Sequence, residues 1–408
     1  MEGWPAGGGA WGGADVALLG LGVVAAGALL HPRLRRRPAW RATVTPLASI
    51  IGSGFLVIAP LLAAIAGPWA AAAMLVLVLF ADAVGAVVRF NIRHVEPLVE
   101  ARRAPPALLR VEDMGDVALG LAYVVSVAFY VRLLGSFALA PLDPAPAWAE
   151  RALTTAVLAA IGATGLLRGL RGLEWLELWA VSLKLAVIAA LLAGLAWHDA
   201  RAAMALPPAP AEDPVHLART LAGALLVTQG FETSRYLGGA YDAATRVRAM
   251  RRAQLLAGAI YVVFVALAAP LTAGLDTTDE TAVIAVAARV APVLPAMLVL
   301  AALMSQLSAA VADTLGAGGL LHEALRRRVP ERAVYGAVTA AAVALVWTAD
   351  VFAIIALASR AFALYYALQC ISALLAARAR GMGAAVQAAF AAMAVLLALV
   401  VVFALPAH

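Results

Sequence analysis

The stretch Ile51-Gly52-Ser53-Gly54-Phe55 interrupts an apolar segment that covers residues 43–66. A second stretch, Thr228-Gln229-Gly230-Phe231-Glu232, interrupts the segment that covers residues 215–237 at a similar depth. A broken membrane helix exposes peptide N–H and C=O groups, which the bilayer tolerates only where they line a cavity or meet a ligand. Paired breaks in two inverted halves are typical of secondary transporters with a site at the mid-plane. The alternative is that the glycines only permit close helix packing.

The composition around these stretches is that of a membrane protein. Of the 408 residues, 64% are hydrophobic and 13% are charged, which excludes the soluble, disordered and fibrous classes. The apolar segments match the roughly 20 residues that a helix needs to cross a bilayer. Strand-like alternation of polar and apolar residues is not seen. We therefore predict an all-α polytopic membrane protein.

The apolar segments predict twelve transmembrane helices, and arginines fill every second connection between them. The positive-inside rule then places the basic connections in the cytoplasm and both termini outside. We expect a multi-pass protein of the cell inner membrane whose first segment is an uncleaved anchor. The net charge of +6 comes from these connections, so no nucleic-acid partner is implied. The predicted spans are 14–30, 43–66, 68–90, 114–140, 152–167, 174–197, 215–237, 253–274, 291–320, 332–348, 350–377 and 385–404.

Ten of these spans divide into two sets of five with opposite orientation, and each set begins with a broken helix. We expect residues 1–42 to form the anchor helix and a basic loop. Residues 43–197 then form the first repeat and residues 214–377 the second. The remaining residues, 378–408, form a C-terminal accessory helix.

Lys184 is the only lysine among 30 basic residues, and it lies within the predicted span 174–197. An ionisable group inside a membrane helix is costly and by default indicates a functional site. Lysine, unlike arginine, loses its proton readily when it is buried. We interpret Lys184 as a coupling residue, chosen for its titration or for its compact charge.

Further polar side chains lie in the predicted span 291–320. Ser305 and Ser308 precede Asp313-Thr314 by one or two helical turns. Together their oxygens could hold Na⁺ or another hard cation, and Asp313 could instead pair with Lys184. The alternative is that Asp313 caps a helix break before Gly316 or faces cytoplasmic water.

Three side chains near the outer ends of their spans are candidate gate residues. Tyr130 and Arg132 lie in one span and Arg360 lies in another. The arginines could attract an anionic substrate group or pair with an acid such as Asp350. The alternative is that their long stems carry the charge to the membrane surface, and that the tyrosine is a packing residue.

The two broken segments resemble those of the amino acid-polyamine-organocation (APC) superfamily of transporters. Ile51-Gly52-Ser53-Gly54-Phe55 is similar to its first core helix, whose amides bind a substrate carboxylate. Gly230-Phe231-Glu232 is similar to its sixth core helix, whose carbonyls bind a substrate amine and whose glutamate braces the break. Lys184 matches the fifth-helix lysine of sodium-independent members, which stands near the sodium site of sodium-coupled relatives. The resemblance covers about residues 43–377 and implies a divergent member with the five-plus-five inverted-repeat fold.

The sequence predicts transport and no enzymatic activity, because its histidines lack metal-binding spacing and no phosphate-binding loop occurs. We expect a secondary transporter for an amino acid or a related small organic cation, with Ile51 to Phe55 and Gln229 to Thr233 as the substrate cradle. No cofactor is expected, and H⁺ or Na⁺ is the candidate coupling ion. One alternative is an inorganic-ion carrier with the same fold. Another is a ligand sensor that transports nothing. The lipid bilayer is the other implied partner, and the sequence leaves the oligomeric state open.

Overall fold

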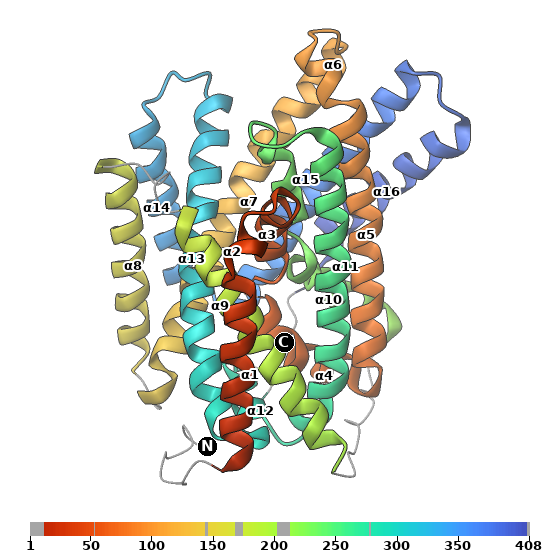
Figure 1. Ribbon diagram of the computed structural model, residues 1–408. Coiled ribbons are helices and arrows are strands. Elements are labelled where there is room, and N and C mark those ends of the chain that lie inside the picture. The colour runs from red at the N-terminus through yellow and green to blue at the C-terminus, as the bar shows by residue number, and fades with distance from the viewer. Residues whose placement is uncertain are drawn as a thin grey trace.

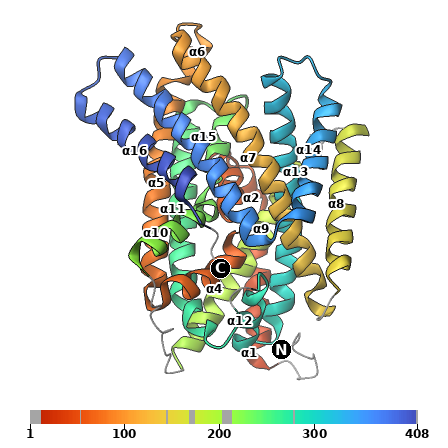
Figure 2. The same cartoon turned by 180° about the vertical axis from the view of Figure 1, so that it is seen from behind.

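The computed structural model describes residues 12–52, 54–142, 146–167, 174–201, 213–276 and 279–405. Every regular element in these ranges is a helix, as predicted. Figures 1 and 2 show long helices that run side by side, with the chain reversing direction at the two ends of the bundle. Eight helices in the described ranges are long and apolar enough to cross a membrane. The protein is thus an all-helical, multi-pass membrane protein.

The first half of the chain contains one helix that is divided in two. Residues 38–66 form α3 and α4, which are separated at residues 51–53 as the sequence predicted. Ser53 itself lies outside the described residues. The elements of this half are α1 (Gly13–Leu30), α2 (Pro32–Arg35), α3 (Pro38–Ile50), α4 (Gly54–Ala66), η1 (Gly67–Trp69), α5 (Ala70–His94), α6 (Glu96–Glu100), α7 (Pro106–Leu139), η2 (Ala140–Leu142), α8 (Ala147–Leu167) and α9 (Glu174–Asp199).

The second half also begins with a divided helix, and its interruption is longer than the sequence predicted. The α-helical part ends at Gly223, and only short 3₁₀ turns follow on either side of Gly230. A short helix, α12, was not predicted. The elements are α10 (Pro214–Gly223), η4 (Leu225–Thr228), η5 (Phe231–Leu237), α11 (Ala243–Ala268), η6 (Ala269–Thr272), α12 (Ala282–Val290), α13 (Val293–Ala324), α14 (Glu331–Thr348), α15 (Val351–Ala379) and α16 (Ala384–Phe403).

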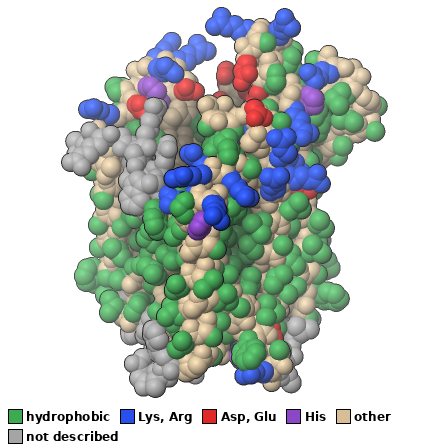
Figure 3. All heavy atoms as spheres, in the orientation of Figure 1, with side chains coloured by type: hydrophobic (Ala, Val, Ile, Leu, Met, Phe, Trp, Pro, Cys, Tyr) green, Lys and Arg blue, Asp and Glu red, His purple; other side chains and the backbone are tan. Residues whose placement is uncertain are grey.

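Burial separates central helices from peripheral ones. In its most apolar window α7 is 83% buried, whereas the corresponding windows of α1 and α16 are 11% buried. Helix α7 packs along α13 and α15. Apolar side chains also cover the lower part of the surface in Figure 3, and the basic side chains gather above them. An apolar helix surface that other helices leave uncovered is what lipid contact requires, so α1 and α16 are peripheral helices.

Helix α1 is attached to the rest of the protein by an acidic side chain. Asp15 is 4% exposed, and its Oδ1 accepts a hydrogen bond of 3.0 Å from the backbone N–H of Val293, the first residue of α13. A carboxylate at a helix N-terminus receives N–H groups that have no partner inside the helix and is favoured by the helix dipole. Along its length α1 packs on α9. Helix α1 therefore joins α9 to the beginning of α13.

Candidate functional site

The two interrupted helices meet at their glycines. Gly230 has φ +113°, and a Cβ atom added to it would lie 2.6 Å from the carbonyl carbon of Ser49. Reciprocally, a Cβ atom on Gly54 would lie 2.7 Å from Cα of Val227. Each break thus leaves room for the backbone of the other, which only glycine permits. The predicted breaks Ile51–Phe55 and Gln229–Thr233 therefore form one structural unit.

A tyrosine that the sequence analysis did not identify connects the two breaks. The Tyr261 hydroxyl on α11 lies 2.9 Å from the carbonyl oxygen of Ile50 and 3.0 Å from that of Val227. Both carbonyls belong to interrupted backbone, and Tyr261 is fully buried. Phe55 packs against the same helix, with its ring stacked on Phe264 at a centroid distance of 4.2 Å. Helix α11 thus supports both breaks from one side.

Loss of this hydroxyl should loosen the contact between the breaks. We expect Tyr261→Phe to lower the free energy of unfolding by about 1–3 kcal/mol, because the buried carbonyls lose a donor. Chemical denaturation of the purified protein in detergent measures the change. The control is Tyr241→Phe, because the Tyr241 side chain is partly exposed. Equal stability of the two variants would contradict the role of the hydroxyl.

Lys184 reaches the first break. Its Nζ donates a hydrogen bond of 2.9 Å to the carbonyl oxygen of Ala48 and a second hydrogen bond to that of Ile51. The side chain is 7% exposed. An ammonium group here supplies hydrogen-bond donors to carbonyls at the end of α3 that the interrupted helix leaves without an N–H partner. Lys184, predicted as a coupling residue, therefore contacts the backbone at the first break, a contact that the sequence did not predict.

A small cavity adjoins Lys184. It holds about 10 Å³, which is room for one water-sized group. Its wall brings together residues of α9, α13 and the first break. The lining includes three of the predicted site residues, Gly52, Phe55 and Ser305, in addition to Lys184.

A second cavity of about 10 Å³ lies where the two breaks cross. Gln229 is 5% exposed, and its Oε1 has no hydrogen-bond partner within the part of the chain that the structure describes. A buried acceptor without a donor costs free energy, so its presence at a cavity favours a ligand that donates a hydrogen bond. The cavity is lined by Ser49, Ile50, Gly52, Gly54, Tyr130, Val227 and Gln229. Tyr130, a predicted gate residue, thus borders the crossing of the breaks.

Glu232 braces the second break. Its Oε2 accepts hydrogen bonds from the backbone N–H of Gly230 at 2.9 Å and from the Tyr366 hydroxyl at 2.6 Å. Phe231 stacks on the Tyr366 ring at a centroid distance of 5.1 Å. Thr233 Oγ1 donates to the Gly230 carbonyl oxygen at 2.8 Å. These three side chains hold Gly230 in its left-handed conformation.

The polar residues of α13 have different surroundings. The helix continues through Gly316 to Ala324, so the alternative reading of Asp313 as the cap of a break is wrong. Asp313 is 6% exposed and close enough to Tyr130 to exert an electrostatic effect on it. Ser308 is buried, and the Thr314 hydroxyl donates to the carbonyl oxygen of Ala310 in its own helix at 2.7 Å. Of this set, Ser305 lines the Lys184 cavity.

The two arginines predicted as gate residues contact different partners. Arg132 Nε lies 3.2 Å from Glu150 Oε1, at the beginning of α8. Arg360 donates a hydrogen bond to the carbonyl oxygen of Ala404, which follows α16. The suggested acid, Asp350, instead caps α15 by accepting from the N–H of Ala353 at 2.8 Å. Arg132 therefore has an acidic partner, which was one of the alternatives that the sequence left open, but this partner is Glu150 and not Asp350.

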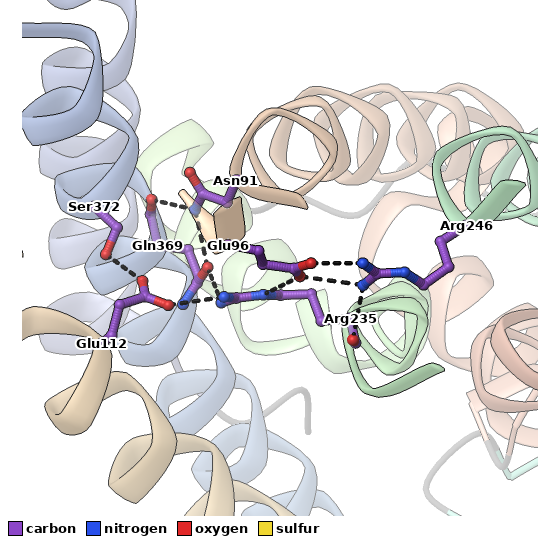
Figure 4. A network of polar contacts seen from close by, with 7 residues as sticks. All are labelled: Asn91, Glu96, Glu112, Arg235, Arg246, Gln369 and Ser372. Carbon is purple, nitrogen blue, oxygen red and sulfur yellow. Dashed lines mark hydrogen bonds and ion pairs between the residues drawn. The ribbon is translucent and has the colours of Figure 1, made fainter. Parts of the chain in front are cut away.

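A network of charged side chains also holds the second break in place, through Arg235 (Figure 4). Arg235 of η5 pairs with Glu112 of α7 at 2.7 Å and with Glu96 of α6 at 3.4 Å. Arg246 of α11 also pairs with Glu96, at 2.6 Å. Sequence reasoning did not identify this network, because the two residues of each ion pair are more than 100 positions apart. The side chains involved are Asn91, Glu96, Glu112, Arg235, Arg246, Gln369 and Ser372.

The sequence of this chain is similar to known transporter sequences. A sequence model described as an APC superfamily transporter matches residues 32–404. An uncharacterized protein of Aquifex aeolicus (strain VF5) is 44% identical over 349 residues, which cover 84% of this chain and 86% of that protein. The residues matched by the family model include both breaks, helix α9 with Lys184, and the charged network.

Proposed function

Because this chain belongs to the APC superfamily of transporters, we propose that it moves an amino acid or a related small organic cation across the cell inner membrane. The observation that carries the proposal is the crossing of the two breaks at Gly54 and Gly230, with a cavity at the crossing. Interrupted helices at a repeat interface are where secondary transporters bind substrate. The unpaired amide oxygen of Gln229 would accept a hydrogen bond from a substrate amine.

The proposed fold is the five-plus-five inverted repeat, with α1 and α16 outside the two repeats. The elements support it, because each proposed half begins with an interrupted helix, α3–α4 in one and α10–η5 in the other. The turns α13–α14 and α15–α16, whose sequences are rich in arginine, lie toward the upper end of Figure 1, and the N-terminus lies at the lower end. This arrangement supports a cytoplasmic upper end and an N-terminus on the outer side. An outer C-terminus is proposed from the alternation of basic connections in the sequence.

We propose that Lys184 supplies the positive charge that a coupling cation supplies in related transporters. Its ammonium group donates to carbonyl oxygens at the first break. Loss of a proton would remove that charge and weaken its hold on the break. Transport would then be coupled to H⁺ without Na⁺. The network of Arg235, Glu96 and Glu112 would close the cytoplasmic side and would have to separate for release.

Binding is tested first by thermal stability against amino acids, polyamines and inorganic cations at two pH values. A ligand at a hundred times its dissociation constant stabilises the folded protein by about 2.7 kcal/mol. We expect one amino acid class to raise the melting temperature of the parent protein. We expect no such effect in Gln229→Leu. The matched control Gln387→Leu, in the peripheral helix α16, should respond like the parent.

Flux into liposomes distinguishes an amino acid transporter from an inorganic-ion carrier and from a ligand sensor. Uptake of the stabilising amino acid, driven by a proton gradient, is the expected result. Stabilisation by an inorganic cation alone would instead indicate an ion carrier. Binding without flux would indicate a sensor. A normal response of Gln229→Leu would contradict the proposed position of the substrate.

A further inference from the structure

Two carboxyl groups meet one hydroxyl where three elements converge. Ser136 Oγ, near the end of α7, lies 2.7 Å from Glu150 Oε1 and 2.9 Å from Glu280 Oε1. Glu150 belongs to the first turn of α8, and Glu280 precedes α12 by one residue. Ser136 is 9% exposed. The cluster therefore connects the segment before α12 to the end of α7 and the beginning of α8.

The hydrogens in this cluster do not suffice for two ionised carboxylates. A serine hydroxyl has one hydrogen to donate, and an ionised carboxylate can only accept. Ser136 Oγ also lies 3.2 Å from the carbonyl oxygen of Arg132, so its one hydrogen has three acceptors within reach. If both short contacts with the carboxyl groups are hydrogen bonds, at least one carboxyl group must hold a proton and donate it to Ser136 Oγ. Arg132 Nε lies 3.2 Å from Glu150 Oε1, so Glu150 already has a cationic partner within the cluster. The proton therefore belongs on Glu280.

The surroundings of Glu280 agree with this assignment. Burial raises the pKa of Glu280 above its usual 4.5, and the negative charge of Glu150 adds to the effect. The hydrogen bonds from its own backbone and from Ser136, and the charge of Arg132, oppose it without reversing it. Other charged or titratable groups of the neighbouring elements are Arg151 on α8, Asp276 and Asp279 on the segment before α12, Arg289 on α12, and His198 and Asp199 at the end of α9.

The contact at Glu280 holds one end of a short helix that packs on α4, the second part of the first broken helix. The inner face of α12 is closed, since Val283, Val286 and Ala287 are at most 1% exposed. It packs on α4, the second part of the broken helix, and on α9, which carries Lys184. Its far end is fixed by Arg289, which donates to the carbonyl oxygens of Leu271 at 2.6 Å and Ala273 at 2.9 Å. The far end is therefore fixed by an arginine and two backbone carbonyls, and the carboxyl cluster fixes the Glu280 end.

We propose that Glu280, Ser136 and Glu150 form a proton-operated latch that holds α12 against α4 and α9, the helices next to the first break. With a proton on Glu280, all three groups are connected and α12 is fixed at both ends. Without it, two carboxylates face one hydroxyl hydrogen and repel each other, so the Glu280 end separates. The protonated form is favoured in the closed state, so the latch is complete at low pH and is lost as the pH rises through the raised pKa of Glu280.

The latch can be tested without any substrate, through the accessibility of a cysteine placed on the inner face of α12. The only native cysteine, Cys370, is buried and is replaced by alanine in every protein. The reporter is Ala287→Cys, and the reference is Leu142→Cys, whose site is 66% exposed. The rate of maleimide labelling in detergent is measured from pH 5 to pH 8 and divided by that of the reference, which corrects for the thiolate fraction.

The relative labelling rate should rise with pH, by up to about tenfold per pH unit, which is the limit for one proton. Adding Glu280→Gln should make labelling slow at every pH, because the glutamine amide always donates to Ser136. Adding Ser136→Ala should make it fast at every pH. Melting temperatures confirm that each variant is folded. A pH dependence that persists in Glu280→Gln, or slow labelling of Ser136→Ala throughout, would overturn the latch.

Discussion

Gly230→Ala is expected to give a transporter that fails to fold stably. The left-handed conformation costs an alanine roughly 1–2 kcal/mol, and overpacking against Ser49 and Ile50 adds about 1–3 kcal/mol. The carbonyl carbon of Ser49 would lie 2.6 Å from the new methyl group, and backbone cannot move aside as a side chain can. The loss should appear as a reduced yield of monodisperse protein and a lower melting temperature.

Two other glycines separate the causes. Gly54→Ala tests close approach without a positive φ, because its methyl group would meet Val227 at 2.7 Å. Gly274→Ala tests a positive φ alone, since Gly274 has φ +75° and no atom within 4 Å of the added methyl group. We expect Gly230→Ala to be the least stable, and Gly54→Ala to be less stable than Gly274→Ala. A Gly54→Ala protein as stable as the parent would mean that the breaks do not cross as described.

Lys184→Ala should abolish proton-stimulated uptake while leaving a folded protein. The carbonyl oxygens of Ala48 and Ile51 lose their ammonium donor, which costs about 1–3 kcal/mol of stability. Uptake should fall by about a hundredfold, equivalent to roughly 2.7 kcal/mol in the barrier. Liposome uptake at several pH values measures the loss. Normal uptake with the parental pH profile would refute the coupling role of the lysine.

A charge-conserving variant shows what the lysine contributes. Lys184→Arg keeps a positive charge that does not titrate in proteins. If the proton on Lys184 leaves during the cycle, Lys184→Arg fails as Lys184→Ala does. If a fixed charge is sufficient, it retains uptake. The melting temperature of Lys184→Ala is also compared in NaCl and in choline chloride. A higher melting temperature in NaCl would indicate that Na⁺ replaces the ammonium group, because carbonyl and hydroxyl oxygens suit a hard cation.

The breaks could be predicted from the sequence because glycines in apolar segments have few other uses. Gly54 and Gly230 stand where the structure requires the absence of a side chain. Their contact with each other could not be predicted, because spacing along the chain does not reveal which segments meet. The same is true of Tyr261, which reads as an ordinary apolar position of a membrane helix. Its function depends on two carbonyls from distant segments.

The charged network was missed for a related reason. Glu112 and Arg235 flank the ends of predicted spans, where charges are common and indicate only an interface with water. Their pairing at 2.7 Å joins residues 123 positions apart. Arg360 shows the opposite error, since its position within a span suggested an acidic gate partner. The structure instead pairs it with a carbonyl after α16, and a backbone acceptor leaves no mark in the sequence.

Fewer membrane-spanning helices can be identified in the structure than the sequence predicts. The breaks divide two helices, and the pieces α3, α4 and α10 are each 13 residues or shorter. A piece of this length does not cross a bilayer alone. Eight helices in the described ranges meet the length and composition of a span. The four predicted spans without such a helix of their own are the two divided ones, 43–66 and 215–237, and the spans 152–167 and 332–348, which lie in α8 and α14. The number of spans and the inverted repeat stay predictions.

Helix α1 sets how the Lys184 cavity can change shape. Two of its walls, Val187 and Ile188 of α9 and Ala302 and Ser305 of α13, belong to helices that α1 fastens together. Asp15 pins α1 to the N-terminus of α13, so these walls behave as one rigid frame. Any change in volume must then come from the third wall, the interrupted backbone at Gly52. The cavity would thus change volume through movement of one wall only, while α1 keeps the other two walls in place.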